Sequence, residues 1–353
     1  MYRYHLQDIE WGKFKISNIF TVEKVIGKPI ENYSIGNIPY ISTASTNNAV
    51  VNFVYDINSV STGNTISVDP IKGSCFYHEY KFVGRGFSGA SVNLLRTDKL
   101  NKYNAIFCCS VIQKTAMEKA SYGYLFNSDR LKNGIILLPI DQDGNPNWHF
   151  MEEYIKEREE KKRSYLLTYY RDKLCDLVIC PEVLTDVKWG EFFVSDVFDT
   201  VQRGKRLTKV NQIYGETPYI SSTSLNNGVD NFIGNIENIR KSDHDLTLAN
   251  SGSVGACFYH DYEYIASDHV TSLKLLNGYD TSYKFMSVIL ARLEGKYSFN
   301  REINDTRIKR EKLLLPIDKD GNPNWSYMEN FIKNIEQKKI KEIIKYLNKY
   351  IYI

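Results

Sequence analysis

Pro139-Ile-Asp-Gln-Asp-Gly-Asn-Pro-Asn-Trp148 recurs later in the chain as Pro316-Ile-Asp-Lys-Asp-Gly-Asn-Pro-Asn-Trp325, with nine of ten positions identical. Three other landmarks precede each copy in the same order: Trp-Gly-x-Phe at Trp11 and Trp189, Pro-Tyr-Ile-Ser at Pro39 and Pro218, and Cys-Phe-Tyr-His at Cys75 and Cys257. The offset between the copies varies only from 177 residues (316 − 139) to 182 residues (257 − 75), which indicates small loop insertions. Such self-similarity predicts a tandem duplication of one fold.

The segments between these landmarks differ between the copies. Pro-Ile-Glu-Asn follows Gly27-Lys28, whereas Arg-Leu-Thr-Lys follows Gly204-Lys205, if the two Gly-Lys pairs are matched. Gly84-Arg-Gly-Phe-Ser-Gly89 has no clear counterpart beside Tyr264-Ile-Ala-Ser-Asp-His269. The simplest interpretation is one fold that carries two different binding surfaces.

Each copy changes character at the Asp-Gly-Asn-Pro turn. Before the turn, short aromatic and β-branched runs broken by Gly, Asn and Pro are typical of strands, and Tyr103–Ala120 and Tyr283–Leu293 have helical spacing. After it, both copies are charged, lack Gly and Pro, and repeat apolar residues at helical intervals. These stretches predict two amphipathic helices of about 26–30 residues, roughly 40–45 Å long.

An apolar stripe on a long helix has to be buried. We therefore expect an α+β fold in which two β-rich units are held apart by two long antiparallel helices, as a pseudo-twofold dumbbell. The expected boundaries are 1–147 and 181–324 for the β-rich units, and 148–180 and 325–353 for the helical segments. The residues expected to pack between the helices or against a partner are Met151, Ile155, Leu166, Leu174, Met328, Ile332, Ile335, Ile343 and Leu347.

The composition excludes several classes of protein. Of 353 residues 42% are hydrophobic and 25% are charged, which excludes a disordered or collagen-like chain. Six cysteines without C-x-x-C spacing predict reduced thiols. The first residues lack the apolar region of a signal peptide, and no apolar run approaches the roughly 20 residues that span a bilayer. We expect a cytoplasmic protein without membrane contact.

The net charge of +3 neither requires nor excludes a polyanionic ligand, so the distribution of charge along the chain is more informative. Arg203, Lys205, Arg206 and Lys209 fall within Gln202–Lys209, a segment without acidic residues. Two related binding units at a fixed separation suit a bipartite ligand. B-DNA presents equivalent groove faces about 34–36 Å apart, which is comparable to the predicted helices.

The order of the duplicated motifs resembles the specificity (S) subunit of type I restriction–modification systems. The motifs are Trp-Gly-x-Phe, Pro-Tyr-Ile-Ser, the approaches Arg130–Pro139 and Arg307–Pro316, and the long helix after each. The Asp-Gly-Asn-Pro-Asn-Trp turn is also similar to specificity subunits of type IIB systems, in which methylation and cleavage share one partner chain. The resemblance covers the chain from Trp11 to its end.

The resemblance implies a non-catalytic subunit with two target recognition domains. Each domain is expected to recognise one half of an interrupted double-stranded DNA site, while the paired helices set the spacer. Two adenine N6-methyltransferase (M) subunits, which use S-adenosylmethionine, are the implied partners. A motor–nuclease (R) subunit that uses Mg²⁺ and ATP is implied for a type I assembly. No cofactor or metal is expected on this chain itself.

Polar side chains on loops are the candidates for contact with DNA. The candidates in the first copy are Lys28, Asn47, Asn48, Arg85 and Ser88. Those in the second copy are Arg203, Lys205, Arg206, Asn226, Asn227, Asp268 and His269. Lys119, Arg130, Lys296 and Arg307 are shared between the copies, so phosphate contact suits them better than base discrimination.

Four patterns that resemble catalytic or metal sites have simpler explanations. Asn145-Pro-Asn-Trp148 lacks the second proline of an adenine methyltransferase motif, and Asp69, Glu79 and Lys81 have only the loose spacing of a metal-dependent nuclease. Cys75 and His78 lack further zinc ligands, so a buried Cys beside a hydrogen-bonded His is expected in each copy. Ser267-Asp-His269 is contiguous, unlike a catalytic triad. A nuclease or methyltransferase with an unrecognised active site and a protein-binding adaptor remain the alternatives.

Overall fold

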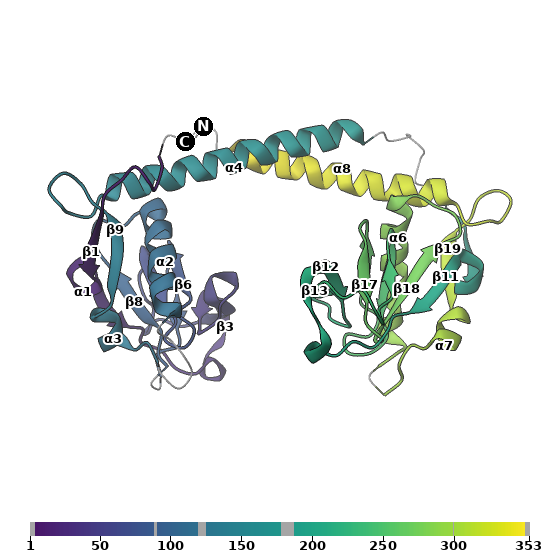
Figure 1. Cartoon of the computed structure of the whole chain (residues 1–353), viewed down its shortest axis with the longest axis horizontal. Coiled ribbons are helices and arrows are strands. Elements are labelled where there is room, and N and C mark those ends of the chain that lie inside the picture. The colour runs from purple at the N-terminus through teal and green to yellow at the C-terminus, as the bar shows by residue number, and fades with distance from the viewer. Residues whose placement is uncertain (1–3, 88–89, 119–124, 178–186, 299, 350–353) are drawn as a thin grey trace. The chain divides into compact units, whose positions relative to one another are not determined.

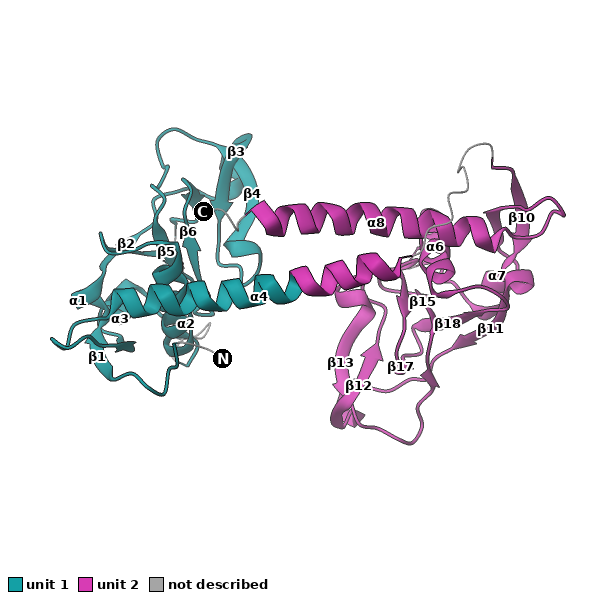
Figure 2. Ribbon diagram, turned by 90° about the horizontal axis from the view of Figure 1, so that it is seen from above, with its two compact units in different colours: residues 1–166 teal, residues 167–353 magenta. Residues whose placement is uncertain are grey.

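The computed structural model describes residues 4–87, 90–118, 125–177, 187–298 and 300–349. The chain divides into two compact units, Met1–Leu166 (unit 1) and Leu167–Ile353 (unit 2), which Figure 2 shows in different colours. The boundary falls within the long helix α4 (Trp148–Asp176), whose C-terminal residues belong to unit 2.

The described part of unit 1 contains three sheets, with the strand orders β2-β8-β5-β6, β4-β3-β7 and β1-β9 (Figure 1). Its strands are β1 (Trp11–Lys15), β2 (Thr21–Lys24), β3 (Ser34–Ile41), β4 (Val50–Tyr55), β5 (Thr65–Val68), β6 (Cys75–His78), β7 (Val83–Gly84), β8 (Asn93–Arg96) and β9 (Ile135–Pro139). Its helices are α1 (Ile16–Ile19), α2 (Lys102–Met117), α3 (Ser128–Lys132) and most of α4, with the 3-10 turns η1 (Ile30–Asn32) and η2 (Asn47–Ala49).

Unit 2 repeats this architecture in its described residues, with the strand orders β11-β18-β15-β16, β13-β12-β17-β14 and β10-β19. Its strands are β10 (Trp189–Phe193), β11 (Phe198–Arg203), β12 (Tyr214–Ile220), β13 (Val229–Ile233), β14 (Lys241–Ser242), β15 (Asp245–Ala249), β16 (Cys257–His260), β17 (Tyr264–Ala266), β18 (Val270–Leu275) and β19 (Lys312–Pro316). Its helices are α5 (Val194–Val197), α6 (Asp280–Ala291), α7 (Asp305–Lys309) and α8 (Trp325–Lys349), with the 3-10 turns η3 (Lys209–Asn211), η4 (Asn226–Gly228) and η5 (Arg292–Gly295). The predicted duplication and α+β fold are confirmed.

The ten-residue sequence shared by both copies folds into a turn that starts the long helix. The Asp141 carboxylate accepts the backbone N–H groups of Asp143 and Asn145 at 3.0 and 2.9 Å. Gly144 has φ +78°, a conformation that favours glycine. The Asn147 side chain then accepts the N–H of Phe150 at 2.9 Å, as an N-cap does. The second copy repeats these contacts with Asp318, Gly321 and Asn324.

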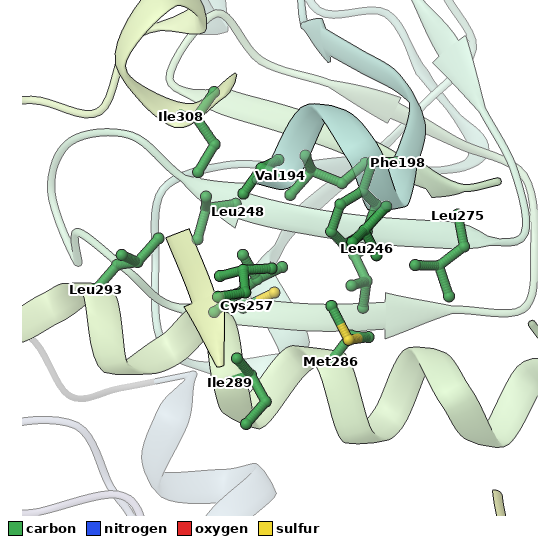
Figure 3. Packing of buried hydrophobic residues seen from close by; sticks show 14 of the residues in the cluster. Val194, Phe198, Leu246, Leu248, Cys257, Leu275, Met286, Ile289, Leu293 and Ile308 are labelled. Atoms are coloured by element: carbon green, nitrogen blue, oxygen red, sulfur yellow. The ribbon is translucent and has the colours of Figure 1, made fainter. Parts of the chain in front are cut away.

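The first turn of each long helix is anchored in the hydrophobic core of its own unit. Met151 of α4 and Met328 of α8 are both fully buried among the core residues of units 1 and 2 respectively. Figure 3 shows the core of unit 2, where Leu246 of β15 lies over Met286 of α6. Each long helix is therefore fixed to its β-rich unit at its N-terminal end.

The two predicted long helices are confirmed, with 29 residues in α4 and 25 in α8. The shorter helices α2 and α6 also match the predicted segments within a few residues. Ile335, another expected packing residue, is 45% exposed on α8, so its contact with a partner stays a prediction. The remaining expected packing residues are partly buried: Ile155, Leu166, Leu174, Ile332, Ile343 and Leu347. No helix among the described segments is long and apolar enough to cross a membrane.

The repeat register differs from the one that the Gly-Lys pairs suggested. A bulge between Phe198 and Thr200 adds one residue, Asp199, to β11 relative to β2, so the offset becomes 179 there. Lys28 then corresponds to Leu207, and Lys205 corresponds to Ile26 (26 + 179 = 205). Matching Gly27-Lys28 with Gly204-Lys205 was therefore wrong by two residues.

Candidate nucleic-acid interface

One loop in each unit is held by the same backbone contacts but carries different side chains. We call residues 25–33 and 204–212 the tethered loops. At the start of the loop, the N–H of Val25 bonds to Val92 O at 3.0 Å, and that of Gly204 bonds to Val270 O at 2.9 Å. Each loop ends in a 3-10 turn, η1 or η3. The two ends of the loop are therefore held alike in both units.

The tyrosine of each Pro-Tyr-Ile-Ser motif fixes the middle of the tethered loop. The Tyr40 hydroxyl donates to Lys28 O at 2.8 Å, and the Tyr219 hydroxyl donates to Leu207 O at 3.1 Å. Both rings are buried, and burial raises the pKa of Tyr40 to about 12 and that of Tyr219 above its usual value. Both hydroxyls therefore stay protonated at neutral pH and keep donating. This explains why the motif is duplicated.

The exposed side chains of the two loops differ in chemistry. Unit 1 presents Ile26, which is 74% exposed, then Gly27 and exposed Lys28, whereas unit 2 presents exposed Lys205 and Arg206, then half-buried Leu207. The side chains of Lys205 and Arg206 form no hydrogen bond or ion pair with the residues that the structure describes. Unit 2 thus offers two cations that are available to an anionic or electron-rich ligand.

The other two basic residues of Gln202–Lys209 have partners within the chain. The Arg203 Nε donates to the carbonyl of Asp268, and its guanidinium lies 3.7 Å from Glu302. Lys209 Nζ lies 4.0 Å from a carboxylate oxygen of Asp230. These contacts fix Arg203 against its own unit, whereas Lys205, Arg206 and Lys209 are exposed, and of these three only Lys209 lies near a carboxylate of the described residues.

The predicted asparagine pairs form the same turn in both units. Asn47 and Asn48 have φ values of 51° and 52°, and Asn226 and Asn227 have values of 49° and 53°. Asparagine tolerates this left-handed conformation better than most residues. The turn closes with the bond from the N–H of Ala49 to Thr46 O in unit 1. The pairs therefore have a structural role in η2 and η4, and contact with bases stays a prediction.

The loops after β7 and β17 differ between the units. In unit 1 the Arg85 guanidinium donates to Ala90 O at 3.1 Å and lies 4.7 Å from the centre of the Phe87 ring. In unit 2 the His269 Nδ1 lies 2.7 Å from Ser251 Oγ, and the Asp268 carbonyl accepts from Arg203. Ser88, which was also expected here, lies outside the described residues.

The basic residues shared by the copies hold their own unit together. Arg130 donates to Leu125 O and Arg307 donates to Glu302 O, both at 2.7 Å. Lys296 lies 2.7 Å from the buried carboxylate of Glu311. Their duplication therefore has a structural explanation, and phosphate contact by them stays a prediction. Lys119 lies outside the described residues.

The duplicated histidines are buried and hydrogen-bonded, as expected. His78 Nε2 lies 2.8 Å from Ser67 Oγ, and His260 Nε2 lies 2.8 Å from Thr247 Oγ1. Burial lowers the pKa of both to about 4. Asp69 is also engaged, because it accepts the N–H groups of Ile71 and Lys72. No cluster of three or more possible metal ligands occurs in the part of the chain that the structure describes.

Comparison with known proteins identifies the class to which this architecture belongs. Residues 8–167 and 186–345 each match the family described as the type I restriction modification DNA specificity domain. The chain belongs to this family and carries the domain twice. It is thus a specificity subunit of a restriction–modification system, and members of this class recognise DNA without carrying out the chemistry.

Individual relatives support the same assignment. The type II restriction enzyme specificity subunit S.BcgI of Heyndrickxia coagulans is 31% identical over 341 residues, which cover 94% of this chain and 96% of that protein. A putative type I specificity subunit of Mycoplasma pneumoniae is 20% identical over 322 residues, covering 86% and 84% of the two chains. The crystal structure of a type I S subunit from M. genitalium has a TM-score of 0.53 at 16% identity, covering 97% and 93%. The last comparison supports the fold.

Proposed function

We propose that this chain directs methyltransferase subunits to an interrupted DNA site in the cytoplasm, with each unit recognising one half-site. The observation that carries the proposal is the pair of tethered loops. The same tyrosine bond holds both loops, yet one exposes Ile26 and the other Lys205 and Arg206. A common frame with unlike side chains is what recognition of two unlike sequences requires.

We further propose that α4 and α8 pair in antiparallel fashion and set the length of the unread spacer. Within unit 2, the Arg171 guanidinium of α4 lies 3.5 Å from the side-chain oxygen of Asn348 of α8. These residues occupy equivalent positions in the two copies (171 + 177 = 348). Contact between equivalent residues is typical of helices related by a twofold axis, and it supports the proposed pairing.

Inserting four residues after Glu160 in α4 is expected to change the spacer and leave both half-sequences unchanged. The insertion lengthens the helix by about 6 Å, which corresponds to about one or two base pairs of DNA. Sequencing of methylated positions in cells that express the chain with its partner subunits measures the recognised site. Four alanine substitutions at exposed positions of α4, which leave its length unchanged, are the control for altered side chains. Altered half-sequences with an unchanged spacer would contradict the proposed role of the helices.

An apolar surface repeated on both units is the proposed contact with the methyltransferase subunits. We call Trp11 and Leu137 in unit 1, and Trp189 and Leu314 in unit 2, the outer patches. These four side chains are 38%, 48%, 46% and 51% exposed. In unit 1 the patch borders a hollow of about 840 Å³ that is also lined by Tyr154 of α4. Because both units keep the patch while their loops differ, it fits two copies of one partner.

The partner subunits would supply the chemistry. S-adenosylmethionine and Mg²⁺ are proposed to bind there, and ATP as well if a motor–nuclease subunit joins the assembly. The 31% identity with a type II specificity subunit over most of both chains supports a type II arrangement.

Replacing Leu137 and Leu314 together with glutamate is expected to weaken association with the methyltransferase subunits at least tenfold, because each change places a charge in a desolvated contact. Both positions are about half exposed, so the fold tolerates the substitutions. Co-purification and light scattering of the assembled complex measure the effect. The Ile57→Glu and Ile236→Glu double variant, which adds the same charge at exposed positions outside the patches, is the control for charge alone. Equal assembly of the leucine variant and the native chain would disprove the patch assignment.

A further inference from the structure

We infer that Lys205 and Arg206 determine the specificity of unit 2 by contacting guanine in the major groove of its half-site. The positions equivalent to them in unit 1 are Ile26 and Gly27, which cannot make this contact. The inference rests on the proposed recognition of one half-site by each unit, and it assigns one base type to one loop.

The first step is that the two tethered loops begin and end with equivalent backbone contacts. Lys24 of β2 lies opposite Asn93, and Arg203 of β11 lies opposite Thr271, immediately before each loop. At the far end, the N–H of Asn32 bonds to Pro29 O and that of Asn211 bonds to Thr208 O. Residues at an offset of 179 therefore match at both ends of the loops, whereas between the ends both the side chains and the local backbone differ.

The second step is that only two cations of this loop are uncommitted. Arg203 and Lys209 have partners in Glu302 and Asp230, whereas the side chains of Lys205 and Arg206 form no contact of this kind among the described residues. An exposed arginine without an intrachain partner keeps all five N–H donors for a ligand. The backbone of Lys205 is nevertheless fixed, because its N–H bonds to Ala266 O at 3.1 Å.

The third step is that unit 1 excludes a side chain at the position of Arg206. A Cβ atom added to Gly27 would lie 2.0 Å from the carbonyl oxygen of Gly84. Unit 1 instead places a cation on the neighbouring strand segment, since Arg85 corresponds to Ser267. The N–H groups of these two residues bond to Ile41 O and Ile220 O respectively. Unit 1 thus carries its cations at Lys28 and Arg85, whereas unit 2 carries them at Lys205 and Arg206.

The chemistry of base edges assigns the ligand. Arginine and lysine donate to the O6 and N7 atoms of guanine more often than they make any other specific base contact. An exposed apolar side chain such as Ile26 suits the methyl group of thymine instead. Phosphate contact would not distinguish the units, because it carries no sequence information. The unlike chemistry at one equivalent place therefore points to base contact.

The test measures base preference in the complete complex. Arg206→Ala and Lys205→Ala are each assembled with the methyltransferase subunits, and methylation of a DNA library randomised over both half-sites is sequenced. We expect the preference for guanine at one position of the unit 2 half-site to fall about ten- to a hundredfold. The unit 1 half-site is expected to be unchanged. Lys209→Ala, a change in the same loop at a paired residue, is the matched control.

A second variant tests whether the tyrosine hydrogen bond positions the loop. Tyr219→Phe removes the hydroxyl that holds Leu207 O and is expected to weaken the preference at the same guanine, with the unit 1 half-site unaffected. An even loss of methylation across all sequences in Arg206→Ala, with a shallower salt dependence, would show a phosphate contact and overturn the inference. Loss of preference in the other half-site would overturn it as well. A native complex that methylates no defined bipartite site would instead refute the proposed function.

Discussion

In a Met328→Ala variant, the free energy of unfolding of unit 2 is expected to be about 2–5 kcal/mol lower than in the native chain. Met328 is fully buried, and it is the point at which α8 enters the core formed by the sheet and α6. The substitution leaves a cavity beside the side chains that surround it, and the helix then loses its anchor. Met151→Ala is expected to act in the same way on unit 1, where its sulfur lies 4.0 Å from that of Cys108.

Urea unfolding of the full chain, followed by pulse proteolysis with fragments assigned to each unit, measures this effect. Ile335→Ala is the matched control, because Ile335 lies on the same helix but is 45% exposed. It is expected to change stability by less than about 0.5 kcal/mol. If both variants lost the same stability, burial of Met328 would not be what fixes the helix.

Acidification is expected to destabilise each unit through its buried histidine. The pKa of His78 and His260 is lowered by burial from 6.5 to about 4, so the folded state favours the neutral ring. Stability from such a group is complete above pH 6.5 and is lost as the pH falls towards 4. A shift of this size corresponds to up to about 3 kcal/mol per histidine.

Unit 2 also contains a buried carboxylic acid, Asp245, whose effect on stability has the opposite pH dependence. Burial raises the pKa of Asp245 from 3.8 to about 6, although the hydroxyls of Tyr264 and Ser242 donate to it. A raised carboxyl pKa means that stability is complete below pH 3.8 and is lost as the pH rises through 6. Asp245 lies opposite His260 in the sheet, at the place that Thr65 occupies opposite His78. The stability that unit 2 loses on acidification through His260 is therefore partly offset by Asp245.

Two variants separate these contributions. Asp245→Asn is expected to stabilise unit 2 at pH 7.5 by up to about 3 kcal/mol and to steepen its loss of stability below pH 6. His78→Gln is expected to flatten the acid loss of unit 1, where the pKa of Asp69 is also raised by burial. The same unfolding measurement between pH 4 and 8 follows both units, and His149→Gln, an exposed change on α4, is the control. An unaltered pH profile in both variants would show that other groups control acid sensitivity.

The sequence alone was sufficient for the architecture because its signals are local or repeated. Asp141, Gly144 and Asn147 act within one turn, so their pattern predicts the start of α4 directly. The uninterrupted charged stretches likewise predicted both long helices. Burial along a helix was less certain: the apolar spacing included Ile335, which the structure leaves exposed, because a periodic pattern does not show where the neighbouring surface ends.

The site was predicted only in part, because its residues depend on contacts between distant segments. The bulge at Asp199 shifts the alignment of the two copies by one residue, so that Lys205 corresponds to Ile26. The sequence alone conceals this correspondence because both copies contain a Gly-Lys pair nearby that invites a different alignment. Three basic residues are of the type that binds phosphate: Arg130, Lys296 and Arg307. Each has a partner within the chain, and the sequence does not reveal these partners because loop geometry brings them together. The asparagine pairs were sought as base-contacting residues, although positive φ explains their duplication. The duplicated Pro-Tyr-Ile-Ser motif contained the missing signal, since a buried tyrosine needs a partner for its hydroxyl.

The bond made by Tyr40 and Tyr219 ends on a main-chain oxygen, a group that every amino acid possesses. Mutation of the anchored residue therefore leaves the anchor in place, as lysine in one unit and leucine in the other demonstrate. If the tethered loops recognise DNA as proposed, new target sequences arise by point changes in a short segment whose main-chain anchor is kept. Such a design lets the side chains of the loop change while the scaffold stays constant.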